Sequence, residues 1–216
     1  MYKLIVFFIF LLTFSCKQST SSTEDVNIKT ARVSTVKNEN VIHSFDSEDL
    51  VTWSRVRVDI EPSSFYYSGL RAYSISRGTA LEPSYLETTS VQVKPGKTYK
   101  VSLVVKKSDE CPFLGLRIVG KYPDRVDAIY NLDNGTVLGV KVAKDFQNPK
   151  ADIEKLKDDW FKCSLTAQLP SSDIKLIMGA TTKDKDVSRW EGKTNKLVKT
   201  YIVPSSIIIE EVFSQH

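Results

Sequence analysis

Hydrophobic and polar residues alternate along most of the chain from about residue 41 onward, and this two-residue period is typical of β-strands with one buried face. In the clearest segment Tyr99, Val101, Leu103 and Val105 share one face. Roughly ten to twelve such short segments are separated by turn residues, which predicts a single antiparallel β-sandwich or barrel of all-β class. The predicted segments are 55–60, 70–76, 85–93, 99–106, 114–118, 126–132, 137–142, 160–169, 174–180, 198–203 and 206–213.

Two stretches are the strongest part of this pattern. Asn134-Gly135 lies between apolar or β-branched residues and predicts a β-hairpin with a type I′ turn, since that turn needs positive φ at both central residues. Residues 160–169 then alternate so that Phe161, Cys163 and Leu165 face a core. Between these stretches, residues 151–159 fit either a short helix or a brief strand, being too short for a helix that is stable alone.

The first residues have the pattern of an export signal. A positively charged head is followed by an apolar run from Leu4 to Phe14, which is too short to span a hydrocarbon core of ~30 Å. The run ends at Ser15-Cys16 and resembles a bacterial lipoprotein signal, in which the cysteine is acylated, although Thr13 stands where leucine is usual. A polar Ser/Thr tract follows and is typical of a flexible tether.

We therefore expect a lipoprotein signal peptide at 1–15, a lipidated Cys16 with a flexible tether at 16–37, and a β-sandwich domain at 38–216. Residues 28–36 fit either the tether or a first edge strand. The expected location is the bacterial cell envelope, with the lipid holding the protein at a membrane. Export would allow Cys111 and Cys163 to form a disulfide. Cys163 also fits a core position, where a free cysteine packs as a small hydrophobic residue, so both alternatives stay open.

Composition and charge exclude several functions. Hydrophobic residues make up 41% and charged residues 26% of the chain, as in a globular protein. The formal net charge is only +4 with both signs interleaved, so the basic stripe of a nucleic-acid-binding protein is missing. The chain has two histidines, His43 and His216, and neither a zinc-ligand spacing nor a glycine-rich phosphate loop. The pairs Asp124/Asp127 and Asp158/Asp159 are expected to be solvated, so we predict no catalytic residues and no enzyme activity.

The order of several segments resembles the carbohydrate-binding jelly-roll domains of the CenC-like (family 4/9) type and the related sandwich domains of phage tail proteins. The matching residues are 95–102, the hairpin 132–137, the run 159–164 and the closing strand 207–212. The resemblance covers about residues 45–213 and implies a β-sandwich of jelly-roll type, with a groove that binds a glycan. It also implies a structural calcium, for which Asp46 and Glu61 are conceivable ligands. Glu210-Glu211 replaces the commoner aspartate there, which favours solvated charges and no metal site or cofactor.

Aromatic residues outside the predicted strands are the candidate sugar contacts, because sugar rings stack on aromatic faces while their hydroxyls bond polar side chains. Trp53 and Trp160 lead directly into strands and are expected to be structural. The predicted carbohydrate-binding residues are two loop tyrosines, a tryptophan in a charged loop and two hydroxyl donors: Tyr66, Tyr67, Trp190, Arg71 and Arg125.

The favoured hypothesis is a non-catalytic, envelope-anchored lipoprotein that binds a polysaccharide or glycan, with the membrane as its other partner and no nucleic acid. The alternative is a structural or adhesion module that uses the same sandwich for protein interaction and binds no sugar. A small polysaccharide lyase or hydrolase on this fold is the third hypothesis. The sequence does not decide the glycan or the oligomeric state.

Overall fold

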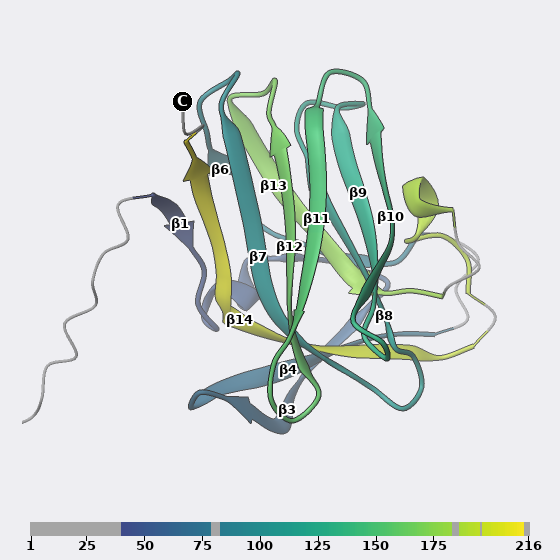
Figure 1. The fold of residues 1–216 in the computed structure, drawn as a ribbon. Helices are drawn as coiled ribbons and strands as arrows, with labels where there is room; N and C mark the ends of the chain where they lie inside the picture. The colour runs from purple at the N-terminus through teal and green to yellow at the C-terminus, as the bar shows by residue number, and fades with distance from the viewer. Residues whose placement is uncertain (1–39, 79–82, 183–185, 195, 214–216) are drawn as a thin grey trace, which may run out of the picture. The chain divides into compact units, whose positions relative to one another are not determined.

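Two antiparallel β-sheets face each other in the sandwich domain, as Figure 1 shows for this computed structural model. The structure describes residues 40–78, 83–182, 186–194 and 196–213. The predicted signal peptide, Cys16 and the tether lie outside these residues. In the described ranges no helix is both long and apolar enough to cross a membrane.

The first sheet, called sheet A, has the order β11-β12-β7-β14-β4-β3, and β1 also pairs with β14. The long strand β14 pairs with β4 through its first half and with β1 through its second half. Its register against β7 shifts between Val203 and Ile208, where the strand changes partners. The strands of sheet A are β1 (Val41–Ser44), β3 (Asp59–Tyr67), β4 (Leu70–Arg77), β7 (Thr98–Lys107), β11 (Gln147–Lys155), β12 (Trp160–Gln168) and β14 (Val198–Val212).

The second sheet, called sheet B, has the order β10-β9-β8-β13-β5-β2, and β6 also pairs with β13. Its strands are β2 (Ser54–Val56), β5 (Tyr85–Glu87), β6 (Val91–Gln92), β8 (Phe113–Val119), β9 (Arg125–Asn131), β10 (Thr136–Ala143) and β13 (Asp173–Ala180). Two short 3₁₀ helices, η1 (Asp49–Val51) and η2 (Val187–Arg189), lie in connections of the described part. Successive strands cross between the sheets at β1–β2, β2–β3, β4–β5, β6–β7, β7–β8, β10–β11, β12–β13 and β13–β14, so the sandwich is of jelly-roll type and this prediction is confirmed.

The alternating positions form the core between the sheets. In β7, Tyr99, Val101, Leu103 and Val105 are all buried and belong to one hydrophobic cluster with residues of sheet B. In β12 the buried partners are Phe161, Cys163, Leu165 and Ala167, as the sequence pattern predicts. Both described cysteines, Cys111 and Cys163, are free and buried, so no disulfide joins them. The interior is therefore held by apolar packing and not by a disulfide. Burial raises the pKa of both thiols.

The predicted hairpin around Asn134-Gly135 is present, but its turn is not of type I′. β9 ends at Asn131 and β10 begins at Thr136, so the loop has four residues. Gly135 has φ of +66°, whereas Asn134 is not among the residues with positive φ. The Asn131 side chain accepts a hydrogen bond from the Asp133 amide at 2.9 Å, which stabilises the wider loop.

A turn with two positive φ values occurs instead between β11 and β12. Residues 147–155 form β11, so the strand alternative for this region is correct and the helix is wrong. The Trp160 amide bonds the Lys157 carbonyl at 3.1 Å and closes a four-residue turn. Its central residues, Asp158 and Asp159, have φ of +56° and +59°, the signs that a type I′ turn requires.

Candidate functional site

A second, smaller hydrophobic cluster lies on the outer face of sheet A, away from the main core. Ala72, Val104, Trp160 and Val203 form it, each from a different strand of the sheet. The β3–β4 hairpin brings Tyr67 against Trp160, with ring centroids 5.5 Å apart and an interplanar angle of 55°. Trp160 is only 4% exposed. This cluster therefore anchors the hairpin on the sheet, and it confirms that Trp160 is structural.

The same hairpin leaves other aromatic rings open to solvent. Tyr66 is 56% and Phe65 is 37% exposed, and Phe65 packs edge-on against Tyr201 of β14 at 4.8 Å between ring centroids. Large apolar side chains that stay exposed side by side are commonly functional. The prediction that Tyr66 and Tyr67 lie in a loop is wrong, since both belong to β3.

An irregularity in β3 produces this arrangement. The register between β3 and β4 shifts between Pro62 and Tyr66. There the Ser63 hydroxyl donates to the Ala72 carbonyl at 2.9 Å and accepts from the Phe65 amide at 3.1 Å. Pairing resumes with Tyr66 opposite Arg71. A bulge of this kind re-aims side chains, which explains how a run of three aromatic residues can serve both the cluster and the solvent.

Two hollows lie among these rings, one on each side of the β11–β12 turn. The larger, of about 390 Å³, is lined by Tyr66, Tyr67, Ser68, Leu156, Lys157, Asp158 and Trp160. The smaller, of about 160 Å³, is lined by Phe65, Lys106, Lys107, Ser108, Asp109, Glu110, Asp159 and Tyr201. Asp158 thus lines one hollow and Asp159 the other. We call the two hollows and their aromatic lining the aromatic site.

Lys106 of β7 joins the parts of the aromatic site. Its ammonium lies 5.4 Å from the ring centroid of Phe65 and 5.6 Å from that of Trp160. It also donates a hydrogen bond to the backbone carbonyl of Asp158. A cation near the faces of two rings is attracted to both, so Lys106 connects β3, β12 and the turn.

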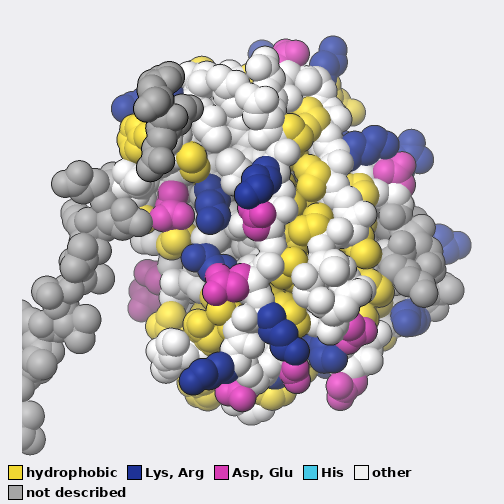
Figure 2. Space-filling model, in the orientation of Figure 1, with side chains coloured by type: hydrophobic (Ala, Val, Ile, Leu, Met, Phe, Trp, Pro, Cys, Tyr) yellow, Lys and Arg dark blue, Asp and Glu magenta, His cyan; other side chains and the backbone are white. Residues whose placement is uncertain are grey.

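The charges around the aromatic site are balanced. Lys107 pairs with Asp133 at 2.8 Å, and this hydrogen bond is the main cause that raises the pKa of Lys107. The pKa of Glu110 is lowered, chiefly by a backbone amide and by the Ser108 hydroxyl. Figure 2 shows Lys/Arg and Asp/Glu side chains intermixed, with a stripe of hydrophobic side chains among them. The site therefore offers ring faces and hydroxyl-bonding groups without a field of one sign.

Of the five predicted binding residues, the structure brings three together. Tyr66, Tyr67 and Arg71 lie at the tip of the β3–β4 hairpin. The Arg71 guanidinium carbon is 6.0 Å from the Tyr66 ring centroid, and its Nε donates to the Ser63 carbonyl at 3.1 Å. Arg71 therefore stabilises the exposed ring and keeps further N–H groups for a ligand.

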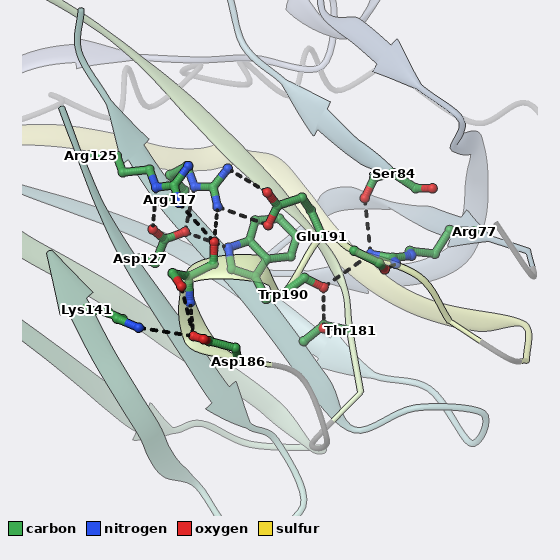
Figure 3. A network of polar contacts seen from close by, with 12 residues as sticks. Arg77, Ser84, Arg117, Arg125, Asp127, Lys141, Thr181, Asp186, Trp190 and Glu191 are labelled. Atoms are coloured by element: carbon green, nitrogen blue, oxygen red, sulfur yellow. Dashed lines mark hydrogen bonds and ion pairs between the residues drawn. The ribbon is translucent and has the colours of Figure 1, made fainter. Parts of the chain in front are cut away.

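Trp190 is placed elsewhere, and its prediction as a ligand contact needs correction. The loop that carries it crosses the outer face of sheet B, where the indole is 0% exposed. A Cβ atom built on Gly115 would lie 2.2 Å from the ring, so the indole occupies a depression that glycine creates. The indole N–H donates to the Asp127 carboxylate at 3.1 Å, as Figure 3 shows. No face of Trp190 is left for a sugar.

Arg125 belongs to the polar network around Trp190 and is also separate from the aromatic site. Its Nε lies 3.3 Å from the Asp127 carboxylate, and its guanidinium donates to the Ser188 carbonyl at 3.2 Å (Figure 3). Arg117 donates to Asp127 at 2.5 Å and forms a two-pronged ion pair with Glu191. Burial raises the pKa of Asp127, although the positive charge of Arg117 opposes this effect. The network fixes the loop to the sheet.

Arg77 fastens the other side of the same loop. Its guanidinium is nearly fully buried and donates to the carbonyls of Ser84, Ala180, Trp190 and Gly192. Burial lowers its pKa to about 10. Four carbonyl acceptors from three segments therefore replace the carboxylate that a buried arginine usually meets.

The candidate calcium ligands Asp46 and Glu61 and the histidine His43 line neither hollow of the aromatic site, whereas the carboxylate pair Asp158/Asp159 lines both. The expectation that Asp124/Asp127 is solvated is wrong for Asp127, which is 1% exposed and forms an ion pair with Arg117. The Asp46 carboxylate accepts hydrogen bonds from the Glu48 and Asp49 amides and so stabilises the start of η1. Among the residues that the structure describes, no group of three or more potential ligands could hold a metal ion. His43 packs edge-on against Phe45 at 4.4 Å and lines neither hollow.

Sequence patterns missed Phe65, Tyr201, Lys106 and the turn Asp158-Asp159 as parts of the aromatic site. Phe65 directly precedes the two predicted tyrosines, so the run of three aromatic residues was the available signal. Lys106 and Tyr201 are neighbours only through the pairing of β7 with β14, which the chain order does not show.

Comparison with known proteins gives only distant similarity. No family model matches the chain, and no curated protein matches it either. Among solved structures, a Clostridium thermocellum xylanase fragment with CBM22-1 and GH10 modules, complexed with xylohexaose, has 11% identity and a TM-score of 0.46. That similarity covers 81% of this chain but only 29% of the xylanase chain.

Two further similar structures are smaller. A Cellvibrio mixtus carbohydrate-binding module in complex with cellotriose has 12% identity and a TM-score of 0.42, over 80% of this chain and 99% of the module. The CBM22-1 xylan-binding domain of a Paenibacillus barcinonensis protein has 13% identity and a TM-score of 0.43, over 82% of this chain and 94% of the domain. At TM-scores below 0.5 these similarities carry no functional argument, so the function must be inferred from the aromatic site.

Proposed function

We propose that this protein binds a polysaccharide or glycan at the aromatic site without catalysing a reaction on it. The observation that carries the proposal is the exposure of Tyr66 and Phe65 beside two hollows that are also lined by charged and hydroxyl groups. A pyranose ring has apolar C–H faces that stack on such rings, and hydroxyls that bond lysine, arginine and aspartate side chains.

The contacts around the rings support binding rather than simple packing. Tyr67 and Trp160 hold the hairpin to sheet A, and Lys106 fixes the β11–β12 turn beside it. The exposed rings are therefore held by neighbours that are themselves packed, which limits the entropy lost when a ligand binds. A protein partner would also be drawn to exposed aromatic rings. The intermixed charges and small hollows fit a chain of hydroxyl-bearing rings better than a broad apolar surface.

We propose in addition that the protein is exported and anchored to a membrane of the bacterial cell envelope by a lipid on Cys16. The apolar run before Cys16 and the polar tract after it support this proposal. A Cys16→Ser variant should then move from the membrane fraction to the soluble fraction. Unchanged membrane retention would contradict the anchor and would leave the glycan proposal untouched.

The test of glycan binding is a glycan array followed by affinity gel electrophoresis of the domain from residue 38 onward. We expect at least one polysaccharide to bind, and Tyr66→Ala to weaken that binding by about tenfold, since a stacked aromatic ring contributes on the order of 1 kcal/mol or more. Tyr122→Ala is the matched control, because Tyr122 is 82% exposed and lines neither hollow. Equal weakening by both substitutions, or no binding at all, would favour the adhesion or interaction module instead.

A further inference from the structure

The turn between β11 and β12 lacks the glycine that its backbone prefers at the second central position, where Asp159 stands. Two consecutive non-glycine residues with positive φ are uncommon, and type I′ turns strongly prefer Asn-Gly. The chain does contain Asn134-Gly135, but in a loop where only the glycine has positive φ. At the turn that needs this pair, the chain has Asp158-Asp159. Unfavourable backbone conformations of this kind concentrate at functional sites.

The position of the turn supplies the independent reason to connect it with a ligand. Asp158 lines the hollow that holds Tyr66 and Trp160, and Asp159 lines the hollow that holds Phe65. The turn thus stands between two groups of aromatic rings, of which Tyr66 and Phe65 are exposed.

The two carboxylates are also not engaged in holding the turn. Lys106 bonds the backbone carbonyl of Asp158 and not its side chain. Over the described ranges of the chain, neither carboxylate forms a hydrogen bond or an ion pair, and Asp159 attracts the Lys107 ammonium only at longer range. The side chains can therefore be exchanged without loss of a contact that maintains the fold.

We propose that the two hollows are adjacent sugar subsites, and that Asp158 and Asp159 each accept hydrogen bonds from hydroxyls of the sugar in their own hollow. This inference rests on the glycan-binding proposal and narrows its ligand. An ionised carboxylate can accept two hydroxyls at once and binds them more strongly than a neutral acceptor. Asp109 and Glu110 add further negative charge to the smaller hollow. Lys106 and Lys107 offset these charges in the smaller hollow, and Lys157 lines the larger one beside Asp158. The proposed ligand is a chain of at least two sugar units whose hydroxyls face the two aspartates, and we expect it to be uncharged because a uronate or sulfate placed against either carboxylate would be repelled.

The deciding variant is Asp158→Asn combined with Asp159→Gly. It installs the preferred residues of a type I′ turn and keeps the backbone carbonyl that Lys106 binds. We expect Tm to rise by about 2–4 °C, because backbone strain is relieved. Binding of the polysaccharide that retains the parent protein should weaken by about tenfold, because charge-assisted hydrogen bonds are lost. Higher stability with weaker binding is a result that a purely structural turn would not give.

Lys144→Gly is the matched control. Lys144 has φ of +64° and lies between β10 and β11, close to the opposite end of β11 from the turn. The glycine should relieve the same kind of backbone strain, so Tm should rise or stay level while binding is unchanged. The gels should contain neutral polymers, namely a mixed-linkage glucan, a xylan and a galactomannan, and acidic polymers, namely polygalacturonate and alginate.

The outcomes separate this inference from the glycan-binding proposal. Retention of the parent by a neutral polymer, with weaker retention of the Asn-Gly variant, supports both. Retention of the parent by an acidic polymer only, equal retention of parent and variant, or a lower Tm of the variant overturns the role of the two aspartates and leaves glycan binding standing. A parent protein that no gel and no array glycan retains overturns glycan binding itself.

Discussion

The outer faces of the two sheets are each covered by a segment that carries aromatic rings and a nearby cation, yet the two covers differ in what they leave exposed. Over sheet B, Trp190 is completely buried and its N–H is bonded to Asp127. Over sheet A, the β3–β4 hairpin buries Trp160 but leaves Tyr66 and Phe65 in solvent. The segment over sheet B leaves no aromatic surface to solvent, whereas the hairpin over sheet A leaves two rings exposed.

The residues of the sheet beneath each cover explain the difference. Gly115 on sheet B gives the indole of Trp190 a depression to enter, because a Cβ there would lie 2.2 Å from the ring. Sheet A has Val104 and Lys106 at the corresponding outward positions, so the rings must lie over side chains and remain partly open. Whether an aromatic residue is available to a ligand thus depends on the strand below it, and not on its being in a charged loop.

The largest expected effect is on stability, when the buried indole of Trp190 is removed from the outer face of sheet B. Trp190→Ala should lower the free energy of unfolding by about 3–5 kcal/mol, because it removes a large buried side chain and leaves Asp127 without one donor. Urea unfolding followed by circular dichroism measures this change. Glycan binding by the folded variant should remain, since the ring is distant from the aromatic site. A small stability change together with lost binding would indicate that Trp190 contacts the sugar.

A smaller effect is expected at the glycine beneath the indole. Gly115→Ala should destabilise the fold by about 1–3 kcal/mol, because its Cβ would lie 2.2 Å from two atoms of a rigid ring. Gly78→Ala is the control, because nothing lies within 4 Å of a Cβ at that position. In the Trp190→Ala background the Gly115→Ala change should lose most of its effect, since the clash is absent. Additive effects would contradict the depression as the reason for the glycine.

The sequence pattern predicts the sheets much better than it predicts the site. Alternation identifies β7 and β12 with the correct buried faces, because a strand facing a core must alternate whatever its neighbours are. It fails at β3, where Pro62 and Ser63 resemble a loop but belong to an irregular strand. The turn chemistry of Asn134-Gly135 is likewise overridden, because pairing of β9 with β10 sets a four-residue loop.

The site depends on contacts between residues that are distant in the chain, and a single sequence does not show which strands pair. Tyr66 and Tyr67 are predicted as aromatic residues of a loop and Arg71 as a hydroxyl donor. These three residues are close in the chain, and they also lie close in space. Trp190 is predicted because it lies in a charged loop outside the strands, and Arg125 because its side chain can donate to hydroxyls. The structure assigns both to the polar network over sheet B. Tyr201 is opposite Lys106 only through strand pairing across more than ninety residues, and Lys106 is opposite Trp160 through the pairing of β7 with β12.

The smallest expected effect concerns Asp186, which precedes the 3₁₀ helix of the loop that carries Trp190. Asp186 precedes η2, and its carboxylate accepts hydrogen bonds from the Ser188 amide at 2.9 Å and hydroxyl at 2.8 Å. These bonds hold the pKa of Asp186 below its usual value, with the amide as the main cause. A carboxyl whose folded-state pKa is depressed stabilises the fold above its unfolded pKa of about 4, and this contribution is lost as the pH falls through the folded-state pKa.

Asp186→Ala should therefore lower the urea midpoint at pH 7, and the difference from the parent should shrink as the pH falls below about 4. Asp186→Asn separates charge from geometry, because asparagine also accepts at a helix start but carries no charge. Its midpoint should lie closer to the parent at pH 7. Between pH 7 and pH 3 its difference from the parent should change by the same amount as that of Asp186→Ala, because both variants lack the titrating carboxyl. A difference between the parent and Asp186→Ala that stays constant over this range would show that the carboxylate charge does not hold the loop, so its attachment to sheet B would rest on the polar network around Trp190 and on Arg77.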